Sequence, residues 1–169
     1  MVASLIPLLL LFVPQDAPCR AVVCTAGEIQ AVYLRGWEAA TEAARVGGSQ
    51  EALTPVRETI ATLERMSRGV HGQAEIAQYV LLAAAGAAQE ERDEMALFIQ
   101  HAVDLEREQL DASQPGAPGI TAHEAAGDLW LLVRRYDDAK RAYERARTVI
   151  GPTPRIQSGL ARAEEALRR

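Results

Sequence analysis

The sequence predicts an all-α protein of about seven helices, arranged as helical hairpins after an N-terminal signal segment. From Gly27 onward, apolar residues recur every three or four positions, which is the spacing of one face of an α-helix. Glycine and proline interrupt these apolar stripes, as expected at the ends of helices. No alternating pattern is long enough to predict a β-strand. Because each helix carries one apolar face, we expect the helices to pack against one another.

Composition allows one ordinary hydrophobic core. The chain has 169 residues, of which 49% are hydrophobic and 24% charged. A net charge of -5 argues against nonspecific binding to nucleic acid. The charge is uneven, because Arg134 to Arg169 holds ten basic and five acidic residues and the preceding part carries about -10. Mixed signs at helical spacing favour a solvated helix face, and a binding patch for an acidic partner is the alternative.

Residues 1–26 are predicted to be a signal peptide or an N-terminal tail. The apolar run from Leu5 to Val13 is far shorter than the roughly 20 residues that span a bilayer, but it fits the core of a signal peptide. Small residues stand at Ala21 and Ala26, and Ala26 is the preferred cleavage site because the predicted helix follows it. Cleavage would make the protein periplasmic or secreted and leave no membrane span. Without cleavage, it would be cytoplasmic or membrane-tethered.

Cys19 and Cys24 are the two cysteines of the chain. Cleavage after Ala26 would remove both. An earlier cut would leave a pair that can close a small disulfide loop in an oxidising compartment. Their spacing is too wide for a CxxC redox motif, and we expect no metal at this pair.

Four apolar stripes predict the first four helices. Gly47 and Gly48 end the first helix, Pro55 lies near the start of the second, and Gly69 and Gly72 separate the second from the third. The stripes are Ile29, Tyr33, Trp37, Ala40 and Ala44; Val56, Ile60, Leu63 and Met66; Ile76, Tyr79, Val80, Leu82 and Ala83; and Met95, Phe98, Ile99, Ala102 and Leu105.

Three further helices follow a loop between Asp111 and Gly119. Thr121 precedes Glu124 at the spacing of a capping box, which predicts the start of the fifth helix. The sixth helix follows Arg135, and Thr153 with Pro154 predicts the cap and first residue of the seventh. The apolar positions are Ala126, Trp130 and Val133 in the fifth helix, Ala139, Tyr143, Ala146 and Ile150 in the sixth, and Ile156, Leu160, Ala163 and Leu167 in the seventh.

The run from Gly127 to Pro154 resembles a tetratricopeptide repeat. The residues that carry the resemblance, and that would pack the repeat, are Gly127, Trp130, Tyr136, Ala139, Tyr143 and Ala146. The resemblance implies a TPR-like α-solenoid over residues 27–169, with its best repeat at 121–154 and a capping helix at 154–168. Met95 lies 44 residues before Ala139, and Ala52 lies 43 residues before Met95, so each is expected to open the second helix of a hairpin. A closed helical bundle is the alternative fold.

The resemblance also implies a non-catalytic scaffold for protein–protein interaction. In such a solenoid, the first helix of each pair lines a groove that receives a partner protein. By resemblance, the candidate groove residues are His123, Asp128 and Arg134. We expect no cofactor, metal, catalytic residue or nucleic-acid partner, and the pattern names no partner protein.

Two other functions stay open. A helical-bundle enzyme or metal-binding protein would build its site from scattered histidines and acidic residues, namely His71, His101, His123, Glu90, Glu91, Asp93 and Glu94. The acidic run fits the start of the fourth helix, where negative charge is favourable, better than it fits a catalytic site. A membrane-tethered assembly factor would retain residues 1–26.

Overall fold

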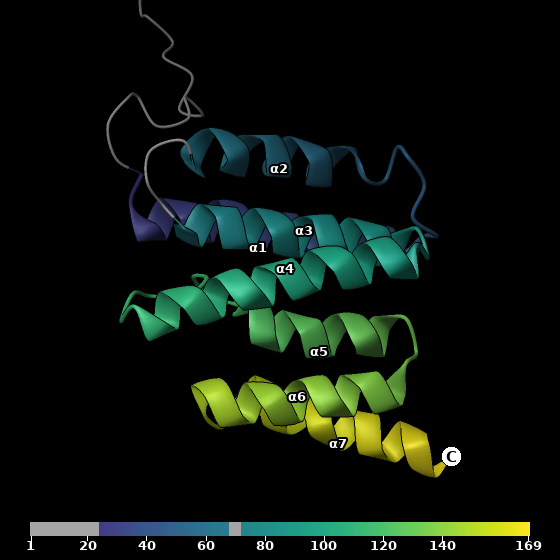
Figure 1. The fold of residues 1–169 in the computed structure, drawn as a ribbon. Coiled ribbons are helices and arrows are strands. Elements are labelled where there is room, and N and C mark those ends of the chain that lie inside the picture. The colour runs from purple at the N-terminus through teal and green to yellow at the C-terminus, as the bar shows by residue number, and fades with distance from the viewer. Residues whose placement is uncertain (1–23, 68–71) are drawn as a thin grey trace, which may run out of the picture.

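The computed structural model describes residues 24–67 and 72–169, and this part of the chain is all-α, as predicted (Figure 1). Its helices are α1 (Ala26–Arg45), α2 (Thr54–Ser67), α3 (Gly72–Ala88), α4 (Arg92–Asp111), α5 (Ala122–Leu132), α6 (Tyr136–Ile150) and α7 (Pro154–Arg168). Within the described ranges, no helix has the length and apolarity needed to cross a membrane.

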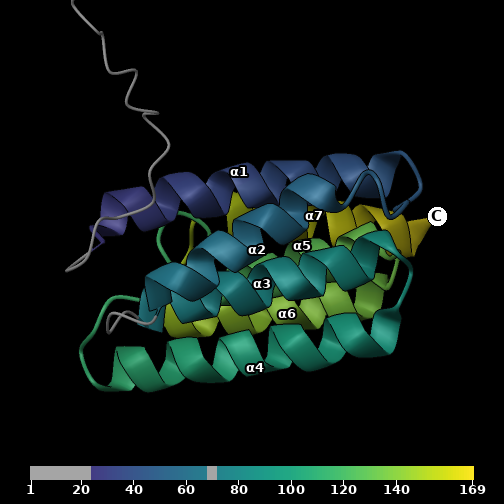
Figure 2. The same cartoon turned by 90° about the horizontal axis from the view of Figure 1, so that it is seen from above.

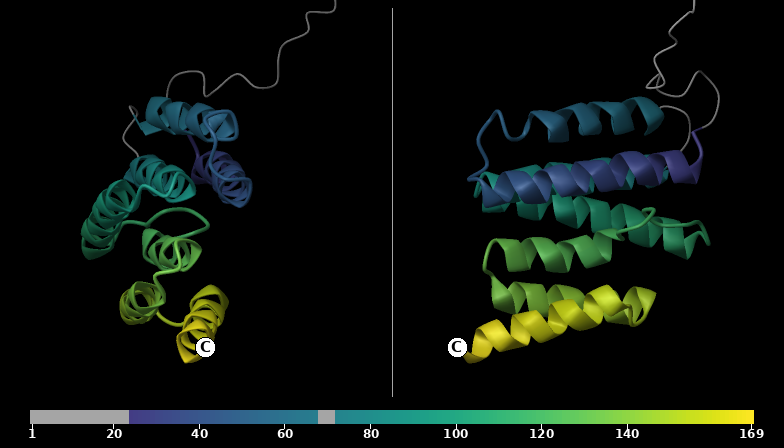
Figure 3. Two further views of the ribbon diagram at one scale, coloured as in Figure 1. Left: turned by 90° about the vertical axis from the view of Figure 1, so that its right-hand side faces the viewer. Right: turned by 180° about the vertical axis from the view of Figure 1, so that it is seen from behind.

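The helices lie side by side with nearly aligned axes, from α2 at one end to α6 and α7 at the other (Figures 1 and 2). Each helix packs against the next one in the sequence. In addition, α1 packs against α3, α3 against α5, and α5 against α7. Seen end-on, α1 and α7 lie on one side of the row and α4 and α6 on the other (Figure 3).

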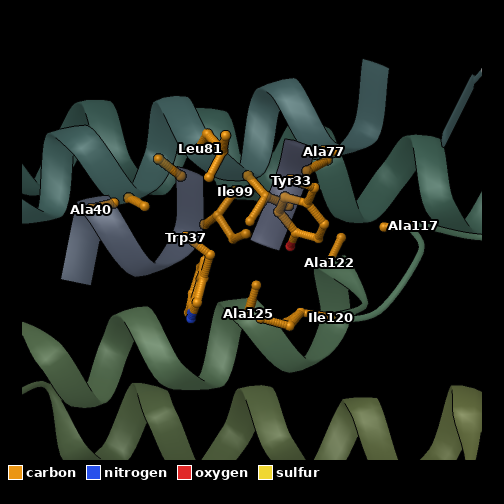
Figure 4. Close-up of a cluster of buried hydrophobic side chains, with 14 of the residues drawn as sticks. Tyr33, Trp37, Ala40, Ala77, Leu81, Ile99, Ala117, Ile120, Ala122 and Ala125 are labelled. Carbon is orange, nitrogen blue, oxygen red and sulfur yellow. The ribbon is translucent and has the colours of Figure 1, made fainter. Parts of the chain in front are cut away.

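A large hydrophobic cluster, which we call the main core, is shared by α1 to α5, the loop before α5 and Ala142 of α6 (Figure 4). Tyr33 and Trp37 of α1 meet Leu81 of α3 and Ile99 of α4 there. Helix α3 is buried over ten of its 17 residues because α1, α2, α4 and α5 all pack against it. Its many alanines allow these neighbours to approach closely.

A second and smaller cluster, the C-terminal cluster, joins α6 to α7 and consists of Ala139, Tyr143, Ala146, Ile156 and Ala163. The ring of Tyr143 lies between two glycines, Gly127 of α5 and Gly159 of α7. A Cβ atom added at either glycine would overlap the ring. Trp130 of α5 is partly buried and contacts both clusters.

Threonine caps begin three of the helices. Thr121 and Glu124 form the predicted capping box at α5, and Thr153 caps α7 with Pro154 as its first residue. A second capping box, which the apolar pattern did not indicate, joins Thr25 to Glu28 at the start of α1. In each of these helices, the threonine hydroxyl therefore accepts from one of the otherwise unpaired N-terminal backbone donors.

The start of α1 bears on the preferred cleavage site. Ala26 is the first residue of α1 rather than the residue before it, so a cut after Ala26 would remove the Thr25 cap. Cys24 is also buried at the edge of the main core and is disulfide-bonded. Cys19, Ala21 and the apolar run lie outside the described residues.

Two other boundaries differ from those expected. Gly72 is the first residue of α3 instead of a residue that separates helices. Ala52 lies in the turn before α2, so it does not open that helix. The interval from Ala52 to Met95 therefore does not join equivalent positions.

Three helices are followed by a non-glycine residue with positive φ: Glu90 (63°), Ser113 (58°) and Arg134 (60°). At Arg134, the backbone N–H of Arg135 donates to the carbonyl of Trp130 over 2.9 Å, and that of Arg134 donates to Leu131 over 3.1 Å. This is the Schellman arrangement, in which a left-handed residue, usually glycine, reverses the chain and satisfies the last carbonyls of the helix.

Candidate functional site

A pocket of about 450 Å³ is lined by residues of α1, α3, α5 and α7 and by Tyr136 at the start of α6. We call it the odd-helix pocket, and its lining residues are Trp37, Ala40, Thr41, Ala84, Asp128, Leu129, Leu131, Leu132, Tyr136, Arg155 and Arg162. This volume lies within the range of roughly 300–1,000 Å³ that is usual for ligand sites.

Asp128 organises the polar side of the odd-helix pocket. Its carboxylate accepts hydrogen bonds from the Tyr143 hydroxyl and from Nε of Arg155, the latter over 2.6 Å. An Nη atom of Arg162 lies 3.7 Å from the same carboxylate. Burial, and then the negative charge of Asp128, raise the pKa of Tyr143, so its hydroxyl stays protonated and donates at neutral pH.

Arg155 joins α7 to α1 across the pocket. Its guanidinium carbon lies 5.8 Å from the ring centroid of Trp37, which is a cation–π distance. Helices α1 and α7 are not among the described pairs that pack directly, so this contact bridges them. Trp37, predicted to be a core residue, is 7% exposed and is both core and pocket wall.

The pocket has an excess of positive charge although the whole chain is acidic. Its charged lining residues are Asp128, Arg155 and Arg162. Two guanidinium groups therefore share one carboxylate. The Arg162 side chain is 63% exposed and that of Arg155 39%, whereas Asp128 is 16% exposed. The positive groups consequently reach the solvent, and the negative group lies beneath them.

Apolar side chains form the rest of the wall. Leu132 stands at the rim and is 38% exposed, whereas Leu129 is buried. Tyr136, at the first position of α6, also lines the pocket. An arginine pair beside an exposed leucine suits a ligand that carries both a negative and an apolar group.

The three candidate groove residues lie in three different environments. Asp128 lines the odd-helix pocket. His123 is 5% exposed and is held by Glu106 inside the protein. Arg134 is exposed in the turn between α5 and α6 and is not part of the pocket wall.

Arg155 and Arg162 were not singled out in the sequence. Their spacing of seven residues places them on one face of α7, and this could have marked them as a pair. The interval alone does not show that Asp128, on another helix, lies against that face.

Glu106 and His123 form a buried pair that anchors the loop before α5. One oxygen of the fully buried Glu106 accepts from the backbone N–H of Ala117 over 2.9 Å. The other accepts from the backbone N–H of His123 over 3.1 Å and lies 2.7 Å from His123 Nδ1. Both oxygens are engaged, so the pair serves to fix the loop against α4.

The other ionisable candidates do not converge in the described part of the chain. His101 is exposed and contacts Tyr79 edge-on, with ring centroids 4.2 Å apart. His71 lies outside the described residues. The acidic run from Glu90 to Glu94 surrounds the start of α4, where a hydrogen bond from the protonated Glu94 carboxyl to Glu91 raises the pKa of Glu94. No group of three or more potential metal ligands occurs among residues 24–67 and 72–169.

No family model, curated protein or solved structure matches this chain.

Proposed function

We propose that this protein is a non-catalytic scaffold that binds a partner protein in the odd-helix pocket. Its architecture would be a TPR-like solenoid of three hairpins, α1–α2, α3–α4 and α5–α6, closed by α7. The observation that carries the proposal is that one pocket is lined by the first helix of every hairpin and by the terminal helix. In a stack of hairpins, these helices form the inner surface available to a partner.

The packing order supports the repeat. Every first helix contacts its own hairpin partner and the first helix of the next unit, and the second helix of each hairpin contacts the following unit. Apart from the contact between Arg155 of α7 and Trp37 of α1, each unit therefore packs only against its neighbours, as in a quasi-one-dimensional array. A closed bundle would also bring α1 or α2 against α6 or α7, and these pairs do not pack among the described helices.

An interval of 44 residues relates the second and third hairpins. Helices α4 and α6 begin at Arg92 and Tyr136, and each follows a residue with positive φ, Glu90 and Arg134. The same interval relates buried Ile99 to buried Tyr143. Equivalent turns and equivalent core positions support two copies of one structural unit.

The test is selection from a random peptide library displayed on phage, with the immobilised full-length protein as the target. We expect peptides that bind the wild-type protein and lose binding to Thr41→Trp, because the larger side chain fills the pocket. The Thr41 hydroxyl bonds to carbonyls of its own helix, so the substitution leaves no partner elsewhere unsatisfied. The control is Leu97→Trp on α4, where the side chain is 67% exposed and outside the pocket. Selection that yields no peptide with this dependence contradicts the proposal.

Export is part of the proposal. If a signal is removed, the cut should precede Thr25, because this residue caps α1. Mass spectrometry of the protein from its native host tests this point. An intact Met1 would instead favour the membrane-tethered alternative, and a mature N-terminus after Ala26 would contradict retention of the cap.

A further inference from the structure

The arginines of the odd-helix pocket have more hydrogen-bonding capacity than Asp128 uses. Arg155 donates from Nε to Asp128, and within the described chain its terminal amino groups have no further hydrogen bond. Arg162 approaches Asp128 at 3.7 Å, which is an ion-pair distance longer than a hydrogen bond. A guanidinium carries five N–H donors in a planar fork that matches a carboxylate.

The position of these donors is fixed. Asp128 holds Arg155 on one side, and the Trp37 ring supports its guanidinium from α1. Asp128 is itself held by the Tyr143 hydroxyl. A ligand would therefore meet one preorganised guanidinium and one more exposed guanidinium, with Leu132 on the wall of the same pocket. Preorganisation lowers the entropy cost of binding.

We propose that the odd-helix pocket binds an internal acidic segment of a partner protein. An Asp or Glu side chain pairs with Arg155 and Arg162, and a neighbouring apolar side chain packs against Leu132. This inference rests on the proposed function and specifies the chemistry of the partner at the same pocket. It assigns the excess positive charge of α7 a role that a purely solvated face would not have.

The exposed rim favours a polypeptide over a small molecule. Sites for small molecules usually enclose about 70–90% of the ligand surface. Here, Leu132 is 38% exposed and Arg162 63% exposed at the mouth of the pocket. A small ligand would leave much of its surface in water, whereas a longer chain can continue along the odd-numbered helices.

The experiment uses the same phage library, in which each peptide is fused through its C-terminus and therefore presents no free terminal carboxylate. We expect the selected peptides to share an Asp or Glu within a few positions of a Leu, Ile, Phe or Trp. Synthetic peptides with both ends blocked are then titrated against the full-length protein. Replacing the acidic residue by its amide should weaken binding about tenfold or more, as for loss of a charge-assisted hydrogen bond.

The protein variant that tests the pairing is Arg162→Glu. Its side chain is 63% exposed, and its interactions with Asp128, at 3.7 Å, and with the Tyr143 hydroxyl lie at the edge of the protein, so we expect the variant to fold. Binding of the acidic peptide should fall about tenfold or more. The matched control is Arg147→Glu on α6, which makes the same charge change at an exposed site outside the pocket. It should alter the dissociation constant less than about twofold at physiological salt.

The outcomes separate this inference from the proposed function. Pocket-dependent peptides without a shared acidic residue would overturn the acidic-segment inference and leave the scaffold proposal standing. Equal binding to wild-type protein and Arg162→Glu would do the same. Absence of any peptide sensitive to Thr41→Trp would overturn both.

Discussion

The main core and the C-terminal cluster are built in different ways. The main core draws on six helices, and its alanines, leucines, isoleucines and valines share the packing among many contacts. The C-terminal cluster has five buried members and is centred on one aromatic ring, Tyr143, lodged between two glycines. The main core can therefore distribute a small change in volume, whereas the C-terminal cluster depends on the fit of one side chain. Because the Tyr143 hydroxyl also holds Asp128, this fit extends to the odd-helix pocket.

The largest expected effect comes from adding a methyl group beside the Tyr143 ring. Gly127→Ala and Gly159→Ala place a Cβ atom 2.4 Å and 2.2 Å, respectively, from the nearest Tyr143 ring atom, so the ring must shift or α5 or α7 must move away from α6. We expect the free energy of unfolding to fall by about 3 kcal/mol in each variant, because overpacking outweighs the better helix propensity of alanine. Urea denaturation followed by circular dichroism measures the change.

Gly27→Ala is the matched control for these variants. Gly27 lies in α1, and the nearest atom to an added Cβ, Thr25 Oγ1, is 4.0 Å away. The same substitution should therefore be neutral or stabilising by up to about 1 kcal/mol. Equal effects at Gly27, Gly127 and Gly159 would show that Tyr143 is not tightly enclosed.

A smaller loss is expected at the anchor beside the main core. Glu106→Gln keeps the shape of the side chain but replaces one acceptor oxygen by an amide NH2 group, which then faces the backbone N–H of either Ala117 or His123. We expect destabilisation by about 2 kcal/mol, as for an unsatisfied buried donor. The Glu165→Gln variant, whose carboxylate makes an exposed ion pair with Arg169, provides the control and should lie within about 0.5 kcal/mol of wild type. A Glu106→Gln protein as stable as wild type would contradict the anchoring role.

The stability of the protein at high pH should depend on the Tyr143 hydroxyl at the centre of the C-terminal cluster. The pKa of Tyr143 is raised, first by burial and then by Asp128. The unfolded chain ionises its tyrosines near pH 10, whereas the folded protein keeps this hydroxyl neutral at higher pH. The contribution to stability is therefore complete below about pH 10 and declines as the pH rises further.

Tyr143→Phe isolates that contribution. It removes the ionisable group, so the stability advantage of wild type over the variant should shrink above about pH 10. The expected change is at most about 1 kcal/mol per pH unit, reduced where solvent screens the hydroxyl. Denaturation curves at pH 8, 10 and 11 measure it, and Tyr136→Phe, at the pocket wall, serves as the control. A gap that stays constant over this range would contradict the raised pKa.

The smallest expected effect concerns the left-handed residues that follow a helix of the main core and the helix beside the C-terminal cluster. Glu90 follows α3, and Arg134 follows α5, each in the left-handed conformation. Glycine adopts this conformation at little cost, so Glu90→Gly and Arg134→Gly should each stabilise the protein by about 0.5–1 kcal/mol. Thermal unfolding would show similar increases for the two variants. Destabilisation by either one would indicate that its side chain contributes a contact that exceeds the backbone strain.

Local signals predicted the helices well because caps and breaks act within a few residues. The Thr121 to Glu124 spacing and the Thr153-Pro154 pair marked the starts of α5 and α7 correctly. Two helix starts, those of α2 and α3, were predicted wrongly. Gly72 suggested a break although it begins α3, and Ala52 fitted an interval although it lies in a turn.

The odd-helix pocket was much harder to predict because it depends on which helices become neighbours. Apolar spacing places Trp37 on the buried face of α1, and this is correct, but it does not reveal that the ring also supports Arg155 of α7. His123 occupies a groove position in the resemblance, yet Glu106, 17 residues earlier, draws it into the interior. Such pairings arise from tertiary packing and leave no periodic signal.

Glu124 has a further consequence for motion in the molecule. Its carboxylate accepts from the Thr121 hydroxyl at the start of α5, and its other oxygen accepts over 2.5 Å from the hydroxyl of Thr153, which caps α7. One side chain thus fastens the first turns of two helices that are separated by all of α6. Their backbone amides should exchange with deuterium at rates that rise and fall together, so the starts of α5 and α7 would open in one concerted event instead of fraying independently.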